Sequence, residues 1–310
     1  MTILDPSLTD TMDAYRTCEF VTLGRDGTPL TWPTAARRRE DGTILVTTSP
    51  AFAQKALNVR RDGRVALLFS DPTGSGLADA TQLFVTGTAV CPDDIMTGPE
   101  GAEDYWTTLF ERQPDSRKYV VPPGRWLMGW YYLRLHITVT PTRMTTRPPL
   151  LPLAATAPAP AGPRPLGAGL LARFPSAVLG ARDASGAPVL VRTRTEPTED
   201  GFAVEPDPDH EMVPGPASLL VHRHDGRLAN LHNALVRGEL RSDGARWWVV
   251  PEKVIEPTGA GRAADMFRTL RNARRATDGY LERRGLSRPA VRWDGFRALA
   301  QEAAARPANG

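Results

Sequence analysis

The stretch that decides the fold runs from Asp41 to Pro72 and reads DGTILVTTSPAFAQKALNVRRDGRVALLFSDP. Its pattern predicts a strand, a short helix and a second strand, with a turn at each joint. Ser49 stands where an N-cap belongs, and Pro50 takes the first helical position, where its missing N–H costs nothing. Asp62-Gly63 ends the helix, and the apolar run 64–69 predicts a core strand.

The two faces of this short helix differ in chemistry. Phe52, Ala56 and Val59 recur at helical spacing and predict a buried stripe. The other face is polar and begins beside three hydroxyl groups at the helix start, where free backbone N–H groups attract anions. These residues predict a phosphate site, although a solvated helix face would show the same pattern: Thr47, Thr48, Ser49, Gln54, Lys55, Asn58 and Arg61.

The lysine in that helix favours the phosphate interpretation. The chain has only three lysines, Lys55, Lys118 and Lys253, among 38 basic residues. A lysine at this position is therefore not explained by background composition.

Length and composition bound the function classes. A chain of 310 residues with 41% hydrophobic content can form two domains with real cores. No apolar run approaches the length of a membrane span, and no secretory signal pattern precedes residue 10. Two cysteines, Cys18 and Cys91, fit buried thiols in a cytoplasmic protein. The net charge of +3 comes with scattered arginines, so we expect neither nucleic-acid binding nor membrane binding.

The rest of the first half predicts further strands, a short N-terminal helix and a longer helical segment. Residues 19–23 and 30–37 predict a hairpin through the turn at Asp26-Gly27, and a short helix precedes it. Residues 82–90 predict a strand, 92–118 are mostly helical in pattern, and 129–140 form a strongly β-prone run. Trp126, Trp130 and Arg134 belong to or adjoin that last run and could wall a bound ring, although such aromatics are more often core residues.

A proline-rich segment separates two similar halves. Residues 147–169 are rich in proline and alanine and predict an extended linker between a domain at 1–146 and a second at 170–310. Short blocks of the first half recur in order beyond it: residues 178–180 match 22–24, 235–238 match 84–87, and 249–254 match 139–144. This order predicts an internal duplication.

The second copy departs from the first at the phosphate helix. Residues 205–216 read EPDPDHEMVPGP, where the prolines disfavour a helix and four carboxylates would repel phosphate. We therefore expect one anion site per chain. Residues 262–284 and 293–306 predict helices that cap the second domain.

The histidines give no clear metal site. His222 and His224 share a face if their segment is a strand, but no cysteine or paired carboxylate completes a ligand set, so we interpret them as polar loop residues. His136 lies in an apolar strand and is expected to be a core or pocket residue. No Ser-His-Asp or Cys-His arrangement supports hydrolysis.

Taken together and in order, these pieces resemble the pyridoxamine 5'-phosphate oxidase-like, FMN-binding split-barrel family. The resemblance rests on Asp26-Gly27-Thr28-Pro29, residues 47–49, Lys55 with Asn58, and the strands 64–68 and 84–89. It covers residues 15–145 and departs from the family at Ala53-Gln54-Lys55, where many relatives carry Ser-x-Lys.

The resemblance implies a mainly β, α+β fold of two tandem split β-barrels with C-terminal helices. It implies a cofactor, FMN or the deazaflavin coenzyme F-420, whose chemistry would make the protein an oxidoreductase acting on a small-molecule substrate. The ring would lie along residues 33–36. The implied contacts are Pro33, Thr34, Ala35, Ala36, Thr47, Thr48, Ser49, Gln54, Lys55, Asn58, Gln82, Trp130 and Arg134.

Two other functions stay open at this point. Some relatives bind haem through histidine, for which His136 and His232 are the candidates, and a non-catalytic binding module is the third possibility. We expect the two barrels to pack as a pseudo-dimer within one chain, with a homodimer as the alternative.

Overall fold

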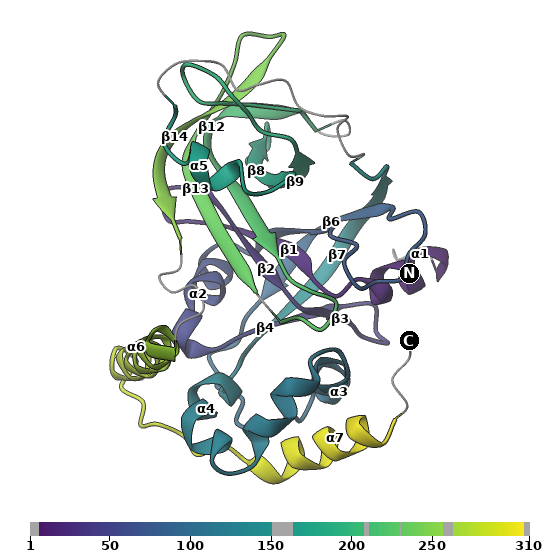
Figure 1. Ribbon diagram of the computed structural model, residues 1–310, viewed down its shortest axis with the longest axis vertical. Coiled ribbons are helices and arrows are strands. Elements are labelled where there is room, and N and C mark those ends of the chain that lie inside the picture. The colour runs from purple at the N-terminus through teal and green to yellow at the C-terminus, as the bar shows by residue number, and fades with distance from the viewer. Residues whose placement is uncertain (1–5, 151–163, 208–210, 230, 257–262, 307–310) are drawn as a thin grey trace.

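The computed structural model describes residues 6–150, 164–207, 211–229, 231–256 and 263–306. Two curled, antiparallel seven-stranded sheets lie one above the other, with helices below and beside the first (Figure 1). Each sheet is a half-barrel, so the predicted α+β fold of two tandem split barrels is confirmed. Most of the predicted linker, residues 151–163, lies outside the described residues.

The first sheet has the strand order β2-β1-β5-β6-β7-β4-β3. Its strands are β1 (Cys18–Leu23), β2 (Pro29–Thr34), β3 (Ala36–Arg38), β4 (Ile44–Thr48), β5 (Arg64–Phe69), β6 (Gln82–Val90) and β7 (Leu135–Arg147). The predicted hairpin strand 30–37 is divided: β2 pairs with β1, whereas β3 pairs with β4 at the other edge. The chain thus crosses from one edge of the sheet to the other near Ala35, which curls the sheet.

The deciding stretch folds largely as its pattern predicts. β4 leads into the 3₁₀ helix η1 (Pro50–Phe52) and then into α2 (Gln54–Arg61), and β5 follows. Ser49 is the cap, and its Oγ accepts a hydrogen bond from the Ala51 N–H at 3.2 Å. The buried stripe is only partly as predicted. Ala56 and Val59 are buried, but Phe52 is 57% exposed because it belongs to the 3₁₀ turn, which does not share the phase of α2.

The second sheet repeats the strand order of the first. Its order is β9-β8-β12-β13-β14-β11-β10 when read from the matching edge. The strands are β8 (Ala177–Asp183), β9 (Pro188–Thr193), β10 (Glu196–Pro197), β11 (Phe202–Val204), β12 (Met212–Arg223), β13 (His232–Ser242) and β14 (Trp247–Ile255). The short helix α5 (Ala168–Leu171) precedes it.

A glycine bulge recurs at the same place in both sheets. The register shifts between Thr86 and Gly87 in the β6–β7 pair, and between Arg237 and Gly238 in the β13–β14 pair. A Cβ at Gly87 would lie 2.5 Å from the Thr140 carbonyl oxygen, and one at Gly238 would lie 2.0 Å from that of Val250. Both bulges therefore need the absence of a side chain.

The two sheets share one hydrophobic core. Val21, Ala66, Leu68 and Phe84 of the first sheet belong to the cluster that fills the second. Arg147 of β7 also crosses the boundary and pairs with the fully buried carboxylate of Asp207 at 2.6 Å. The acidic segment after β11 thus supplies an ion pair between the sheets, and its described residues form no helix.

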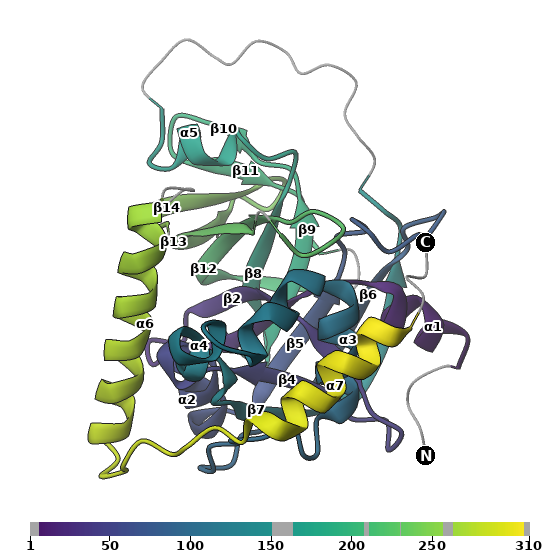
Figure 2. The ribbon, with the colours of Figure 1, turned by 60° about the horizontal axis from the view of Figure 1, so that its bottom comes forward.

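Helices lie beneath and beside the first sheet, and α6 runs along the flank of both sheets (Figure 2). They are α1 (Pro6–Ala14), α3 (Glu103–Arg112), η2 (Pro114–Val120), α4 (Gly124–Tyr132), α6 (Ala263–Glu282) and α7 (Trp293–Ala305). Trp106 of α3 lies at the centre of this layer, stacked on Tyr132 at 5.1 Å and edge-on to Phe296 at 4.8 Å. The two C-terminal helices are confirmed, but α7 packs on α3 of the first half and does not cap the second domain.

Two predictions about the connection from β6 to β7 are wrong. Residues 129–132 are the end of helix α4, and β7 begins only at Leu135. The reason is tertiary, because the helix buries Tyr132 among the aromatics of α3 and α7, and Trp130 beside Phe52. Residues 92–102, predicted to be mostly helical, form no helix before α3 begins at Glu103.

Candidate functional site

A buried group of polar residues lies at one end of the first barrel, and we call it the lysine pocket: Cys18, Thr47, Lys55, Tyr105 and Arg134. Lys55 and Arg134 are only 8% and 6% exposed. Neither makes an ion pair within the described part of the chain. Burial, with Arg134 adding repulsion, lowers the pKa of Lys55 to about 8. Two buried cations without a carboxylate form a site that would favour an anion.

Further donors in this pocket are unsatisfied. The Arg134 Nε makes no hydrogen bond, and its guanidinium lies over the Tyr131 ring at 4.0 Å. Thr47 Oγ1 makes no hydrogen bond of ordinary geometry, although the Tyr105 hydroxyl lies close to it. Lys55 Nζ lies 5.7 Å from the centre of the Trp32 ring. Three of the residues predicted to contact the cofactor are therefore brought together: Thr47 and Lys55, expected at its phosphate, and Arg134, expected at its ring.

The rest of the predicted phosphate site is arranged differently. Thr48 Oγ1 donates to the Phe52 carbonyl at 2.9 Å, and Ser49 Oγ donates to the Trp130 carbonyl at 2.6 Å. Asn58 is fully buried and donates to Thr22 Oγ1 at 2.9 Å. Gln54, Asn58 and Arg61 lie together on α2, linked by hydrogen bonds through Asn58 Oδ1. Lys55 and Asn58 are buried, so the alternative of a solvated helix face does not describe them. Thr48, Ser49 and Asn58 therefore use their side-chain hydrogen-bond donors within the protein, where they stabilise the fold.

A groove of about 910 Å³ runs between the two barrels, and we call it the interbarrel groove. One wall comes from the β1–β2 turn, β2 and the outer side of α2, and the other comes from β12, β13 and the end of β14. Its lining is mixed, with leucines from both sheets, the aromatic Trp32 and three arginines. The polar lining residues include Arg25, Thr31, Gln54, Arg61, Asn233 and Arg237.

Part of this polar lining is already paired. Arg237 binds Asp26 at 2.6 Å, and Arg61 donates to Asn58 Oδ1 at 3.2 Å. Arg25 makes no ion pair in the portion of the chain that is described, and Thr31 Oγ1 is buried without a hydrogen bond. The groove thus offers a cation and an aromatic ring within one space, while the Thr31 hydroxyl is covered beside Gly180 of β8.

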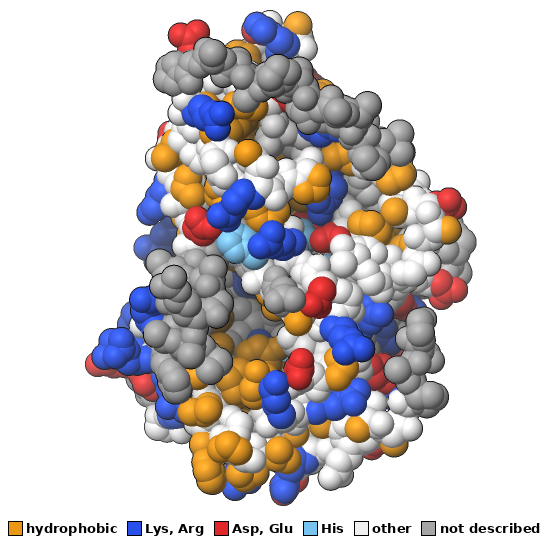
Figure 3. Space-filling view, in the orientation of Figure 1, with side chains coloured by type: hydrophobic (Ala, Val, Ile, Leu, Met, Phe, Trp, Pro, Cys, Tyr) orange, Lys and Arg blue, Asp and Glu red, His pale blue; other side chains and the backbone are white. Residues whose placement is uncertain are grey.

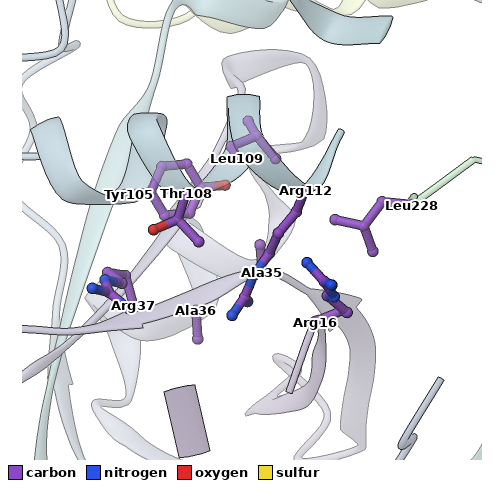
Figure 4. Close-up of a pocket in the computed structure, with 9 residues that line it drawn as sticks. All are labelled: Arg16, Ala35, Ala36, Arg37, Tyr105, Thr108, Leu109, Arg112 and Leu228. Atoms are coloured by element: carbon purple, nitrogen blue, oxygen red, sulfur yellow. The ribbon is translucent and has the colours of Figure 1, made fainter. Parts of the chain in front are cut away.

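The strand expected beneath the cofactor ring is largely covered. Ala35 and Ala36 line a small cavity of about 10 Å³, closed by α3 through Tyr105, Thr108, Leu109 and Arg112 (Figure 4). A space of that size holds about one water, so a three-ring flavin does not fit there. Pro33 and Thr34 line neither this cavity nor the groove. The part of β2 that lines the interbarrel groove is residues 30–32.

Two other predicted contacts are separated from the lysine pocket. Gln82 lies at the far end of the barrel, where β6 begins opposite Arg147, and its Nε2 donates to the Pro148 carbonyl at 3.1 Å. Trp130 lies on α4, where its ring meets Phe52 edge-on at 5.9 Å. Sequence reasoning missed Trp32, Arg25 and Tyr105. Only the position of Trp32 within a ring-binding strand could have pointed to it.

The two candidate haem ligands lie apart. His136 is on β7, where burial and the nearby Arg39 lower its pKa to about 4, and its Nε2 is unpaired. His232 begins β13, stacks on Phe174 at 5.6 Å and lies 3.1 Å from Arg173. Neither histidine lines the groove.

His222 is a strand residue, which corrects the sequence interpretation, whereas His224 lies in the loop that directly follows the strand. His222 ends up inside β12, and its Nε2 lies 2.6 Å from the buried Glu19 carboxylate of β1. Arg192 of β9 binds the same carboxylate at 2.7 Å, and His224 lies 3.6 Å from Asp71. These histidines belong to a buried polar network between the barrels. Across the described ranges, no cluster of three metal-ligating side chains occurs.

The donors and dimensions of the groove fit an anionic, ring-bearing cofactor, whereas the covered strand does not. A volume of about 910 Å³ lies in the range of small-molecule sites. An arginine at its edge suits phosphate, and Trp32 with the leucines suits an aromatic ring. The buried Lys55–Arg134 pair behind Trp32 adds positive potential. The groove therefore has room for such a cofactor, whereas the cavity at Ala35 and Ala36 does not.

Comparison with known proteins found similar solved structures but no matching family model or curated sequence. No protein-family model matches the chain, and a search of curated proteins found no similar sequence. Among solved structures, the conserved protein Rv2991 from Mycobacterium tuberculosis is 20% identical, with a TM-score of 0.34 over 51% of this chain and 94% of the other. An F420 reductase is 22% identical, with a TM-score of 0.28 over 42% and 88%. A FAD-binding protein from Mesorhizobium loti is 15% identical, with a TM-score of 0.31 over 45% and 89%. At these TM-scores the alignments carry no argument about what this chain binds.

Two surface findings complete the description. Arginines are scattered over the face in Figure 3 and do not gather into one stripe. Within the described residues, none of the helices combines the length and the apolar character needed to cross a bilayer.

Proposed function

We propose that the chain is a flavin-type redox protein that holds FMN or the deazaflavin coenzyme F-420 in the interbarrel groove. The observation that carries this proposal is the groove itself, a cofactor-sized space with Trp32 and leucines along its walls and Arg25 at its edge. When bound, the cofactor would supply the hydride chemistry for a small-molecule substrate. The chain's own residues bind it, orient it and keep water from its ring.

The chemistry of each lining residue indicates which part of the cofactor it would contact. Arg25 and Arg61 would meet the phosphate, because guanidinium groups bind phosphate in a bidentate way. Trp32 would lie against the ring. Lys55 and Arg134 act behind Trp32 by raising the positive potential that favours the anionic cofactor.

The tandem arrangement is part of the proposal. We propose a cofactor-binding barrel at 1–146, a linker at 147–169 and a second, degenerate copy at 170–310 that supplies the opposite wall. The equal strand orders and the paired glycine bulges support a duplication. Because the second copy lacks a counterpart of α2 in its described residues, we expect one cofactor per chain.

Titration of the purified protein with FMN, and separately with F-420, tests the proposal by absorbance and fluorescence. We expect one saturable site per chain for one of them. Leu57→Glu, on the groove side of α2, should weaken that binding about tenfold or more by placing a carboxylate beside the phosphate. The matched control is Leu127→Glu on α4, a similarly exposed leucine that does not line the groove.

The other outcomes each identify a different function. A Soret band on addition of haem, without flavin binding, would favour the haem alternative. Failure to bind either flavin or haem would leave a non-catalytic binding module. Two equivalent flavin sites per chain would contradict the degenerate second copy.

A further inference from the structure

Three arginines converge on the small cavity beneath α3, and we call this group the arginine pocket: Arg16, Arg37 and Arg112 (Figure 4). Arg112 extends from α3 toward Ala35, with Arg16 on one side and Arg37 on the other. They come from three separate segments: the residue pair before β1, strand β3, and helix α3. The fold therefore assembles the cluster, which no short sequence motif contains.

The charge in this pocket is not balanced. The nearest acid is Asp13, and it is shared between Arg37 at 3.5 Å and Arg38 at 2.8 Å. Glu111 is the other carboxylate nearby, but it pairs with Arg306 at 2.7 Å. The Nε atoms of both Arg37 and Arg38 are buried without a hydrogen bond.

Two of the arginines are held mainly by backbone carbonyls. Arg112 donates to the carbonyls of Tyr15, at 2.7 Å, and Asp13, and Arg16 donates to Gly74 at 2.6 Å. Carbonyl oxygens satisfy donors but do not cancel charge. Burial, followed by the repulsion of Arg16 and Arg37, lowers the pKa of Arg112 to about 10. Three cations therefore repel one another at one cavity, and an anion would relieve that repulsion.

The pocket also lies on the seam between the barrels. Leu228, in the loop between β12 and β13, forms its far side, and the Gln113 Nε2 donates to the Leu228 carbonyl at 3.0 Å. Gly74 and Gly226 touch nearby, and a Cβ at Gly74 would lie 2.7 Å from the Gly226 Cα. A ligand here would contact both halves of the chain.

We propose that the arginine pocket binds a small oxyanion, a phosphate or carboxylate group, at a site separate from the interbarrel groove. The enclosed volume of about 10 Å³ admits about one oxygen atom, so the group sits at the mouth with one oxygen directed inward. Guanidinium edges recognise both phosphate and carboxylate, so their shared chemistry defines the ligand class.

The alternative is that these arginines have only a structural role and stabilise the neighbouring loops through hydrogen bonds. It accounts for the carbonyl bonds of Arg112 and Arg16, but Arg37 has only the long contact to Asp13 and an unpaired Nε. A structural role also predicts no response to oxyanions. The two interpretations can therefore be separated by binding.

Isothermal titration of the protein without cofactor, with sodium phosphate and separately with sodium acetate, provides the test. Sodium chloride at matched ionic strength is the reference. We expect one saturable site for phosphate, for acetate or for both. Phosphate alone identifies a phosphate group, and acetate alone or both identifies a carboxylate-tolerant site.

The variant should remove charge and keep the fold. Arg16→Gln with Arg37→Gln leaves Arg112 and its two carbonyl bonds in place, and we expect it to weaken binding about tenfold or more. Arg143→Gln, at an exposed arginine on β7 outside the pocket, removes one surface charge as a control and should bind as the wild type does. Thermal melting establishes that each variant is folded.

Lys55→Met separates this site from the lysine pocket. We expect it to leave phosphate binding unchanged. The proposal is overturned if phosphate and acetate act no differently from chloride, if the Arg143→Gln control weakens binding equally, or if Lys55→Met abolishes binding. Because no flavin is present, each of these results is independent of whether the groove holds a cofactor.

Discussion

Replacing Lys55 with methionine should stabilise the protein and weaken cofactor binding, two effects of opposite sign. Lys55 is 8% exposed, and burial, with the repulsion from Arg134 added, lowers its pKa from 10.5 to about 8. Below pH 8 the Lys55 ammonium is charged in both states, but its burial makes the charged form less stable in the folded protein than in the unfolded chain. At about 1.4 kcal/mol per pH unit, this difference costs about 3 kcal/mol of stability at pH 7.

The sign of the pH dependence follows from proton binding. Between pH 8 and 10.5 the unfolded chain keeps the lysine proton and the folded protein loses it, so the Lys55 contribution to the free energy of unfolding rises with pH. Buried Cys18 and Tyr15, whose pKa values are raised, act in the opposite direction at high pH. Cys18 and Tyr15 are present in both proteins, so their contributions largely cancel when the free energy of unfolding of the wild type is subtracted from that of Lys55→Met.

Urea denaturation from pH 7 to 10.5 measures this difference. Lys55→Met should be more stable than the wild type by about 3 kcal/mol at pH 7, and the gap should close toward pH 10.5. The exposed Lys253→Met is the control and should follow the wild-type curve. In the binding assay, Lys55→Met should weaken the binding of FMN or F-420, because it removes a buried positive charge behind Trp32. A pH-independent difference, or no gain at pH 7, would refute the electrostatic argument.

Three further predictions concern the seam and the glycine bulges. Glu19→Gln should lower the free energy of unfolding by about 3 kcal/mol in urea titrations, because it leaves the buried Arg192 and His222 without their shared carboxylate; a change below about 0.5 kcal/mol would show that the network is incidental. Gly238→Ala should destabilise by about 1–3 kcal/mol, since its Cβ would lie 2.0 Å from the Val250 oxygen. Gly169→Ala, in a helix with nothing within 4 Å of the new carbon, should be neutral or stabilising, and equal melting temperatures for the two glycine variants would contradict the bulge argument.

The strands were predictable because their signals are local. The predicted strand 82–90 has the same bounds as β6. The stretch from Asp41 to Pro72 forms β4, α2 and β5 as predicted, because turn residues and periodicity act over a few positions. The matching blocks on either side of the linker also occupy corresponding strands of the two sheets.

The site was predictable only in part because side-chain direction is set by packing. α2 buries Lys55 and Asn58, since its neighbours Thr22 and Trp32 come from strands distant in sequence. The β-prone run at 129–132 became helical because α3 and α7 surround it with aromatic rings. No local pattern could reveal that α3 covers Ala35 and Ala36.

The two ends of the β1–β2 hairpin explain why one chain should offer one cofactor site. In a two-fold dimer of identical barrels each site occurs twice, because every residue has an equivalent in the partner. Two linked copies are free of that constraint. Here one end of the hairpin opens into the groove beside α2, and the other end is closed by α3 over the arginine pocket. The second sheet has no helix between β11 and β12 in its described residues, and Asp207 of that segment is committed to Arg147. A second groove would need both a helix and a free cation at that position. The two proposed sites therefore assign a ring-sized ligand to one end of the hairpin and a small anion to the other.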